Sequence, residues 1–323
     1  VCSIGVNLSL YLKAGVIYPF LKEKAEKLDT GTRDELIKKI SASVYHHMGY
    51  VVLTGTDNIL ITSFIGIVWS GIYSNYSLLI SVIVAFTKLF FDAITASVGN
   101  LAVSTDNVTS HKVFMRIQFM NFLIVGLFSV CLYILLNPFI NLWIGEDYLL
   151  DDFTVFTIVA TYYFGYDGIK KCVTIFKRTT GVFYYDRYSP VAEAIINIVF
   201  SVILAKIFGI SGVFMGTIIA ALATNIWVEP YVVYKHFFKT PLNNYFKKLI
   251  LYSIATLMTG IIVKNIVSLI NRTTWLGFFV MAVCCVLLTV LIFTLLFIRT
   301  DEFKYFYQLG KDFLSKYVFH KKR

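Results

Sequence analysis

Apolar runs of membrane-spanning length alternate with short polar stretches along almost the whole chain. A helix needs roughly 20 apolar residues to cross a bilayer core. The runs predict eight complete membrane helices and one partial helix (1–18), the complete ones at about 48–69, 76–99, 114–137, 153–175, 190–208, 212–235, 249–269 and 276–298. Helices satisfy all their backbone polar groups within lipid, so the pattern predicts an all-α polytopic membrane protein.

Two segments carry a much higher density of charge. Residues 19–47 alternate acidic and basic side chains, which predicts a polar linker, and Thr32 and Glu35 have the capping-box spacing of a short surface helix. Residues 299–323 place aromatic side chains at helical spacing among lysines. This pattern predicts a basic amphipathic helix that lies on anionic membrane lipids.

The distribution of basic residues predicts how the chain is oriented in the membrane. Hydrophobic residues make up 58% of the sequence, and the net charge is +10. Of the 29 lysines and arginines, 24 fall in the alternate loops 19–47, 100–116, 170–188, 235–248 and 299–323. Basic loops stay on the cytoplasmic side, so the linker and the C-terminus are predicted to be cytoplasmic. The concentration of basic residues in these loops also explains the positive net charge, so a nucleic-acid partner is not needed to account for it.

Polar side chains inside the apolar runs are candidates for function. Each intramembrane charge that faces lipid costs roughly 2.5–3.5 kcal/mol, so such groups should face protein or a watery cavity. Glu193, Asn197 and Ser201 recur every four residues on one face of the helix at 190–208, which only three residues separate from the next run. Asp57 has no basic residue three or four positions away on its own helix, which favours a functional role.

A second set of intramembrane charges allows two interpretations. Lys88 and Asp92 are four residues apart, so they form either a structural ion pair or part of a functional polar face. Asp167 has ion-pair spacing to Lys170 and Lys171 near the interface, which favours a structural pair. Glu229 precedes Pro230 and is interpreted as a feature of a helix end.

A basic cluster marks the predicted cytoplasmic end of the same helices, where an anionic substrate would enter. Ordinary positive-inside bias is the alternative explanation. The cluster consists of Lys170, Lys171, Lys177, Arg178 and Arg187.

Signatures of enzymes are missing from the sequence. All five histidines fall in predicted cytoplasmic loops, and the five cysteines lie in apolar runs without metal-ligand spacing. No phosphate-cradling glycine loop follows a strand. The sequence therefore predicts no enzyme activity and no cofactor.

Four segments together resemble a known family. They are TDNILITSFIG (56–66), GIYSNYSLL (71–79), NPFINLWIGEDY (137–148) and the stretch from SPVAEAII to GTII (189–219). Their order and spacing resemble the polysaccharide flippases, for O-antigen and capsule repeat units, of the MOP exporter superfamily. These transporters have two six-helix lobes and move undecaprenyl-diphosphate-linked oligosaccharide to the outer leaflet of the bacterial cytoplasmic membrane by alternating access.

The resemblance implies a domain plan for a MOP/MATE-like chain that lacks most of the first lobe. Accordingly, the chain alone is expected not to flip substrate. The implied parts are the last helix of the first lobe at 1–18, the inter-lobe linker at 19–47, the second six-helix lobe at 48–235, an extra helix pair at 236–298 and a cytoplasmic tail at 299–323.

The resemblance also implies roles for individual residues. In the related lipid II flippases, the first and fifth helices of the second lobe form a cation site. Here this implies a site for a coupling Na⁺ or H⁺ made by Asp57, Glu193 and Asn197, with Ser201 or Thr54 in support. The hypothesis for the substrate diphosphate names Lys88, Asp92, Lys170, Lys171, Arg178 and Arg187.

The expected partners are lipid-linked oligosaccharide, anionic lipids and the polysaccharide polymerase machinery. A drug/cation antiporter of the same superfamily is the alternative, and a membrane glycan polymerase or acyltransferase is a weaker one, because the longest predicted outer loop is short and has no histidine.

Overall fold

The structure is a computed structural model that describes residues 2–19, 29–165, 168–270 and 274–318. These residues form helices joined by short turns, with no strand among them. The chain divides into two units, Val1–Ser41 and Ala42–Arg323. The first unit contains α1 (Cys2–Ile17) and the beginning of α2 (Thr30–Phe64), and the second contains everything that follows. The prediction of an all-α chain is confirmed for the described residues.

Six helical stretches in the described ranges are long and apolar enough to cross a membrane. They are Ile67–Leu101, Asn107–Ile144, Ser189–Phe208, Ile210–Phe238, Asn243–Val267 and Trp275–Phe297. Two of the eight predicted spans are not among them. Most of the span predicted at 48–69 lies in α2, whose N-terminal half is charged and which ends at Phe64. The span predicted at 153–175 is divided into two shorter helices.

The helices of the second unit follow α2 in chain order. They are α3 (Ile67–Ser104), α4 (Asn107–Ile144), η2 (Glu146–Tyr148), α5 (Asp152–Phe164), α6 (Lys171–Thr179), η3 (Val182–Tyr184), α7 (Ser189–Phe208), α8 (Ile210–Ala223), α9 (Asn225–Val233), η4 (Tyr234–Phe238), α10 (Asn243–Val267), α11 (Trp275–Phe297) and α12 (Asp301–Val318).

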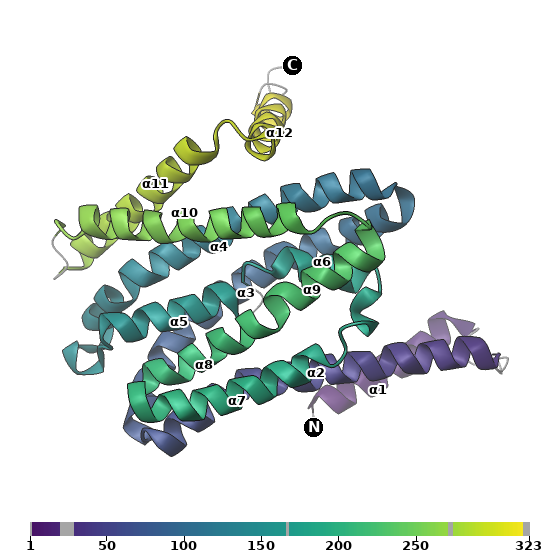
Figure 1. The fold of residues 1–323 in the computed structure, drawn as a ribbon, viewed down its shortest axis with the longest axis horizontal. Coiled ribbons are helices and arrows are strands. Elements are labelled where there is room, and N and C mark those ends of the chain that lie inside the picture. Colours follow the sequence, from purple (N-terminus) through teal and green to yellow (C-terminus); the bar gives the residue numbers. More distant parts are fainter. Residues whose placement is uncertain (1, 20–28, 166–167, 271–273, 319–323) are drawn as a thin grey trace. The chain divides into compact units, whose positions relative to one another are not determined.

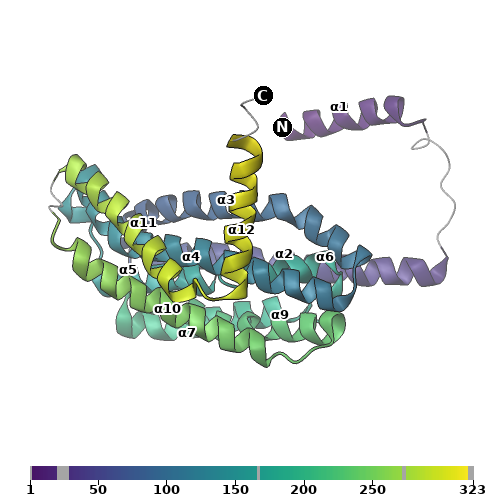
Figure 2. The same ribbon diagram turned by 90° about the horizontal axis from the view of Figure 1, so that it is seen from above.

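The second unit is a helical bundle in which α4 holds a central place (Figures 1 and 2). Contacts join α4 to α3, α5, α6, α10, α11 and α12, and α8 to α5, α7 and α9. The fully buried rings of Phe114, Phe119 and Phe122 extend from α4 into the core.

The turn between the first two helices of this unit lies earlier than the sequence predicts. The polar stretch 70–75 is helical and belongs to α3, and the chain turns at Ile65 and Gly66 instead. Gly66 has a φ of 128°, a conformation that residues with a Cβ rarely adopt. A single glycine therefore overrides the polar stretch as the helix boundary.

The helix predicted at 153–175 is interrupted between α5 and α6. The backbone N–H of Ile169 donates to the carbonyl of Tyr163 at 2.8 Å, six residues back instead of the four of a continuous α-helix. Gly168 lies so close to this turn that a Cβ on it would be 2.2 Å from the Tyr163 carbonyl oxygen. The Asn121 amide donates to the carbonyls of Gly168 and Ile169 at 3.1 and 2.7 Å. The amide thereby satisfies backbone groups that an interrupted helix leaves free within the membrane.

The tight hairpin predicted around residues 209–211 is present, since α7 ends at Phe208 and α8 begins at Ile210. The two helices approach closely at Gly216, where an added Cβ would lie 2.3 Å from the Ser201 hydroxyl. Small residues allow helix backbones to pack this tightly within membranes. The hairpin thereby sets the polar face of α7 against α8.

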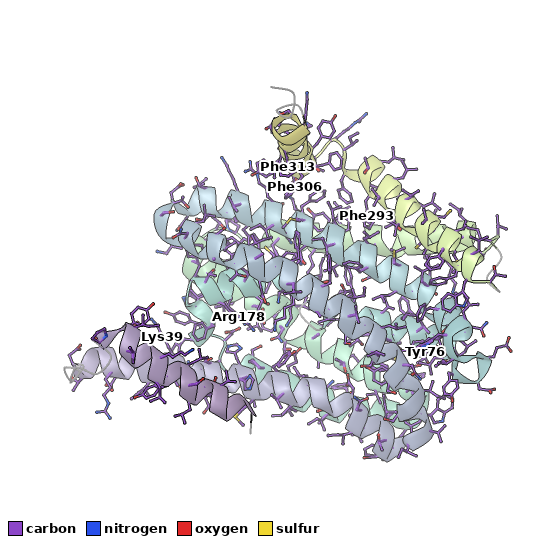
Figure 3. The ribbon with its side chains drawn as sticks, turned by 180° about the vertical axis from the view of Figure 1, so that it is seen from behind. Lys39, Tyr76, Arg178, Phe293, Phe306 and Phe313 are labelled. Carbon is purple, nitrogen blue, oxygen red and sulfur yellow. The ribbon has the colours of Figure 1, made fainter. Side chains whose placement is uncertain are left out.

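The C-terminal helices α10 and α11 pack on α4, and α12 also contacts α4. The ring of Phe306 on α12 faces that of Phe119 at 6.4 Å, while Phe313 is exposed (Figure 3). The Arg116 guanidinium lies 3.7 Å from the ring centre of Tyr305, and Lys248 pairs with Glu302. The predicted tail helix is therefore attached to the bundle by its first turns.

Candidate functional site

A cavity of about 640 Å³ opens among α2, α3, α6, α7 and α9. Its charged lining comprises Lys88, Lys170, Lys171, Lys177 and Arg178 together with Asp92, Glu193 and Glu229. Five lysine and arginine side chains thus face three carboxylates, and His46 and His47 also line the wall. The interruption between α5 and α6 is responsible for part of this lining, because Lys170 and Lys171 follow it directly. The lining favours an anion.

Glu229 is the centre of a buried ion-pair network rather than a feature of a helix end. It lies within α9 and is 4% exposed. Its carboxylate is 3.0 Å from the Lys177 ammonium and 3.6 Å from that of Lys170. The Thr174 hydroxyl donates to its other oxygen at 2.9 Å. The network joins α6 to α9.

Lys177 also binds Asp186, at 2.6 Å, and both side chains are almost fully buried. The second oxygen of Asp186 is 3.2 Å from Nε2 of His46, and the same Nε2 is 3.1 Å from the Phe183 carbonyl. The Phe183 carbonyl can only accept a hydrogen bond, so Nε2 carries the hydrogen. Asp186 was not singled out in the sequence because it lies in a loop whose basic residues dominate.

Lys88, Asp92 and Arg178 line the cavity and are exposed. Within the described ranges, no ion pair joins Lys88 to Asp92, although they are one helical turn apart. Lys88 and Arg178 are therefore two exposed lining cations that lie outside the network of Glu229 and Asp186. Figure 3 shows Arg178 among the side chains of the bundle.

Two predicted residues are not found in the lining, one of them because it is not described. Arg187 is not part of the lining, since its guanidinium lies over the rings of Tyr184 and Tyr188 at 4.2 and 4.5 Å. Asp167 lies outside the described residues. The basic cluster predicted at the cytoplasmic mouth is therefore brought together except for Arg187.

A second polar group connects three helices deeper in the bundle. The Thr217 hydroxyl on α8 is 3.2 Å from Oδ1 of Asp57 on α2 and accepts a hydrogen bond of 2.8 Å from the Asn197 amide on α7. Asp57 is 2% exposed, and Asn197 is fully buried. Thr217 was not predicted from the sequence, although its position directly after Gly216, in the run that follows the tight hairpin, was an available signal.

The remaining predicted members of the cation site have other partners. Glu193 lines the cavity and accepts a hydrogen bond from the Asn225 amide, whose oxygen in turn accepts one from Ser189. The Ser201 hydroxyl donates to the carbonyl of Val213 at 2.9 Å. The side chain of Thr54 lies outside the described residues. The structure therefore brings Asp57 and Asn197 together and places Glu193 on the cavity wall.

The group around Thr217 has the chemistry of a small-cation site. Oδ1 of Asn197 is buried and has no hydrogen-bond partner among the described residues. Carboxylate, amide, hydroxyl and backbone carbonyl oxygens are the donors that hard cations prefer. Asp57, Asn197 and Thr217, with the Val213 carbonyl 3.3 Å from the Thr217 hydroxyl, supply one of each. These residues fit a sodium ion or a proton.

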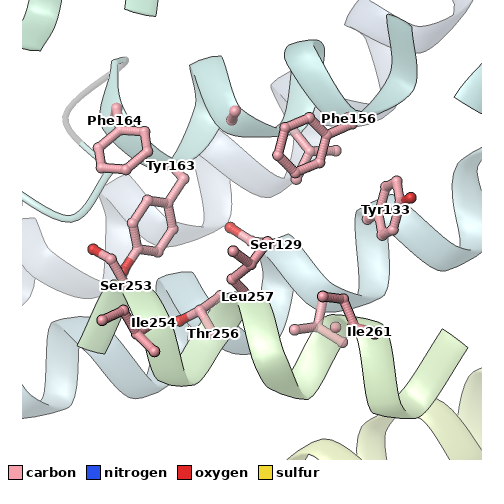
Figure 4. A pocket seen from close by; sticks show the side chains of 14 residues that line it. Ser129, Tyr133, Phe156, Tyr163, Phe164, Ser253, Ile254, Thr256, Leu257 and Ile261 are labelled. Carbon is pink, nitrogen blue, oxygen red and sulfur yellow. The ribbon is translucent and has the colours of Figure 1, made fainter. Parts of the chain in front are cut away.

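An apolar cavity of about 460 Å³ lies apart from both polar groups, between α4, α5 and α10 (Figure 4). The rings of Phe156, Tyr163 and Phe164 form one wall, and Leu257 and Ile261 belong to the other. Its wall has few polar groups, among them the Tyr163 and Ser253 hydroxyls, which are 3.2 Å apart. This cavity offers no charge to a polar ligand.

The described residues contain no group of three or more histidine, cysteine, aspartate or glutamate side chains arranged to hold a metal ion. Comparisons of the chain with protein-family models, curated proteins and solved structures find no match.

Proposed function

We propose that the protein carries lipid-linked oligosaccharide diphosphate across the bacterial cytoplasmic membrane, as one lobe of a flippase for polysaccharide repeat units. The observation that carries this proposal is the cationic cavity among membrane helices. Its lining has five lysine and arginine side chains and three carboxylates, and Asp186, outside the lining, pairs with one of these lysines. An excess of positive charge remains, and lysine and arginine bind the oxygens of a negatively charged diphosphate through charge-assisted hydrogen bonds.

Some of the lining cations have carboxylate partners among the described residues and others have none, and this difference supports a binding role. Lys177 and Lys170 are held by Glu229 and Asp186, so they shape the wall. Lys88 and Arg178 are free of carboxylate partners within the described chain and would contact the diphosphate. The basic mouth is assigned to the cytoplasmic side, where the substrate is made available, in accord with the placement of basic loops.

The cation site would couple transport to an ion gradient. His46 and Asp57 lie three helical turns apart on α2, on nearly the same helix face. A movement of α2 that follows cation binding at Asp57 would therefore also move the wall of the anion cavity. Alternating access involves two lobes that move around a shared site, and we assign one of them to this chain.

A drug/cation antiporter is the second candidate. Its substrates are commonly cationic, and a cavity with excess positive charge would repel them. The charge of the cavity therefore favours the flippase.

Binding of undecaprenyl diphosphate to the 323-residue chain in nanodiscs tests the proposal. Lys88→Ala is expected to weaken binding by about tenfold or more, because a hydrogen bond to a charged group contributes about 1.5–3 kcal/mol. Lys206→Ala is the matched control, since Lys206 is an exposed lysine in α7 that does not line the cavity. Equal affinities for the wild type and Lys88→Ala would contradict the role of Lys88.

A further inference from the structure

Buried contacts of its own residues fix the segment between α6 and α7 to the rest of the bundle. Asp186 is 4% exposed and forms an ion pair with Lys177, and its other oxygen lies 3.2 Å from Nε2 of His46. The carbonyl of Phe183 is a second partner of the His46 ring. The residues on either side of Asp186 are therefore fixed to a buried ion pair, although they form no long helix of their own.

This segment presents tyrosines that remain exposed. Tyr185 stacks on His236 with ring centres 3.7 Å apart and planes 6° apart, yet it is 57% exposed. Tyr188 lies 5.6 Å from the Tyr45 ring and is 59% exposed. We call Tyr45, Tyr184, Tyr185, Arg187 and Tyr188 the tyrosine rim.

Each ring of the rim has a partner that holds it. His236 covers one face of Tyr185, so the exposure of this ring comes from its other face and its edges. The Arg187 guanidinium lies over both Tyr184 and Tyr188 and donates to the Tyr184 carbonyl at 3.2 Å. A surface that is already ordered loses less conformational entropy when a ligand binds.

The tyrosine rim borders the anion cavity. Phe183 and Pro190 line the cavity, and they flank the rim segment at either end. His46 also lines it and directly follows Tyr45. A ligand whose anionic group lies in the cavity would therefore continue over the rim.

We propose that the tyrosine rim binds the sugar rings of the lipid-linked substrate while the diphosphate lies in the cavity. A pyranose ring has a C–H face that packs on an aromatic ring and hydroxyls at its edge that need hydrogen-bond partners. Tyrosine offers an apolar ring with a polar tip, and Arg187 adds guanidinium donors. This inference rests on the proposed function and adds the part of the site that recognises the sugar.

Two probes separate the inference from the proposed function. They are undecaprenyl diphosphate and the same lipid with N-acetylglucosamine attached, each titrated into the whole chain in nanodiscs. The wild type is expected to bind the sugar-bearing probe more tightly. Tyr185→Ala and Tyr188→Ala should each weaken that binding by about three- to tenfold, as the loss of one aromatic contact would, and leave the affinity for the sugar-free probe unchanged.

Tyr231→Ala is the matched control, because Tyr231 is 45% exposed and has Lys235 over its ring at 5.2 Å but lies on α9 outside the rim. Tyr188→Phe keeps the ring and should retain most of the sugar-dependent affinity, which guards against a folding defect in the alanine variant. If the two alanine variants lose the same affinity for both probes, or lose none for either, the sugar site is wrong, whereas the diphosphate site is not contradicted. If neither probe binds the wild type, the proposed function fails together with the inference.

Discussion

The ammonium of Lys177 lies 2.6 Å from the carboxylate of Asp186, and only nine positions separate the two residues along the chain. The pair fixes α6 to the segment that leads into α7. Through Glu229, at 3.0 Å from the same ammonium, it also fixes α6 to α9. One buried cation thus determines how three parts of the cavity wall are placed.

Replacement of Lys177 by alanine is expected to destabilise the protein by about 3–5 kcal/mol, because it leaves two buried carboxylates without their principal cation. Unfolding of the purified chain in detergent measures this change. The control is Lys39→Ala, which removes an exposed pair with Glu35 and should change stability by less than about 1 kcal/mol. A similar small effect for both variants would contradict the structural role of Lys177.

Gly168→Ala is expected to disrupt the turn between α5 and α6. The new Cβ would lie 2.2 Å from the Tyr163 carbonyl oxygen, so the backbone would have to move and would displace Lys170 and Lys171 from the cavity wall. Lower thermal stability together with weaker diphosphate binding is the expected result. Gly260→Ala is the control, since its Cβ would meet only Val130, at an ordinary 3.9 Å. If Gly168→Ala keeps wild-type stability and binding, the turn does not position the two lysines.

Much of the fold follows from the sequence because long apolar runs have few alternatives in lipid. The runs behind α7, α10 and α11 give helices whose ends agree with the predicted ones within a few residues, apart from an earlier start for α10. The interruption between α5 and α6 was not predicted. Gly165 and Gly168 do not by themselves predict a helix break, because membrane helices tolerate glycine. The hydrogen bonds from Asn121 stabilise the interrupted backbone, and they come from a distant part of the sequence.

The candidate site could be predicted only in part, for a similar reason. Helical spacing placed Glu193 and Asn197 on one face of α7, but it could not show that they bind different partners on the neighbouring helices. The ion pairs of Glu229 could not be predicted, because its partners Lys170 and Lys177 come from another part of the chain and the pairing depends on how α6 packs against α9. Spacing along one helix carries no information of that kind.

Asp151 makes the stability of α5 depend on pH. Burial acts to raise the pKa of this N-cap carboxyl, but hydrogen bonds from the Thr154 hydroxyl and from the N–H groups of Phe153 and Thr154 outweigh it and lower the pKa below the ordinary value. The stabilisation is therefore complete above the ordinary aspartate pKa of about 3.9 and is lost as the pH falls through the lowered one.

Asp151→Ala is expected to lower the free energy of unfolding by about 0.5–2 kcal/mol at neutral pH, as for other N-cap replacements. It should also make this free energy depend less on pH in the acid range. Asp147→Asn is the control, because Asp147 is exposed in η2 and caps no helix. If the free energy of unfolding falls with decreasing pH in Asp151→Ala as it does in the wild type, the cap does not contribute to the pH dependence of stability.

Asp57→Asn tests the cation site. Sodium in place of choline is expected to raise the unfolding temperature of the wild type, since a ligand that binds only the folded state stabilises it. The variant lacks the carboxylate charge and should lose this response. Asn58→Ala, at an exposed neighbouring position, should keep it. A sodium response that survives Asp57→Asn would contradict the assignment of the site.

The charge preference of the cavity is the most direct test of the central claim. The chain in nanodiscs is titrated with undecaprenyl diphosphate and, separately, with the lipophilic cation tetraphenylphosphonium, in the wild type and in Lys88→Ala. We predict that the diphosphate lipid binds the wild type, that Lys88→Ala weakens it, and that tetraphenylphosphonium neither binds the cavity nor competes. Saturable binding of tetraphenylphosphonium that strengthens in Lys88→Ala, without binding of the diphosphate lipid, would contradict the flippase and favour the cation antiporter.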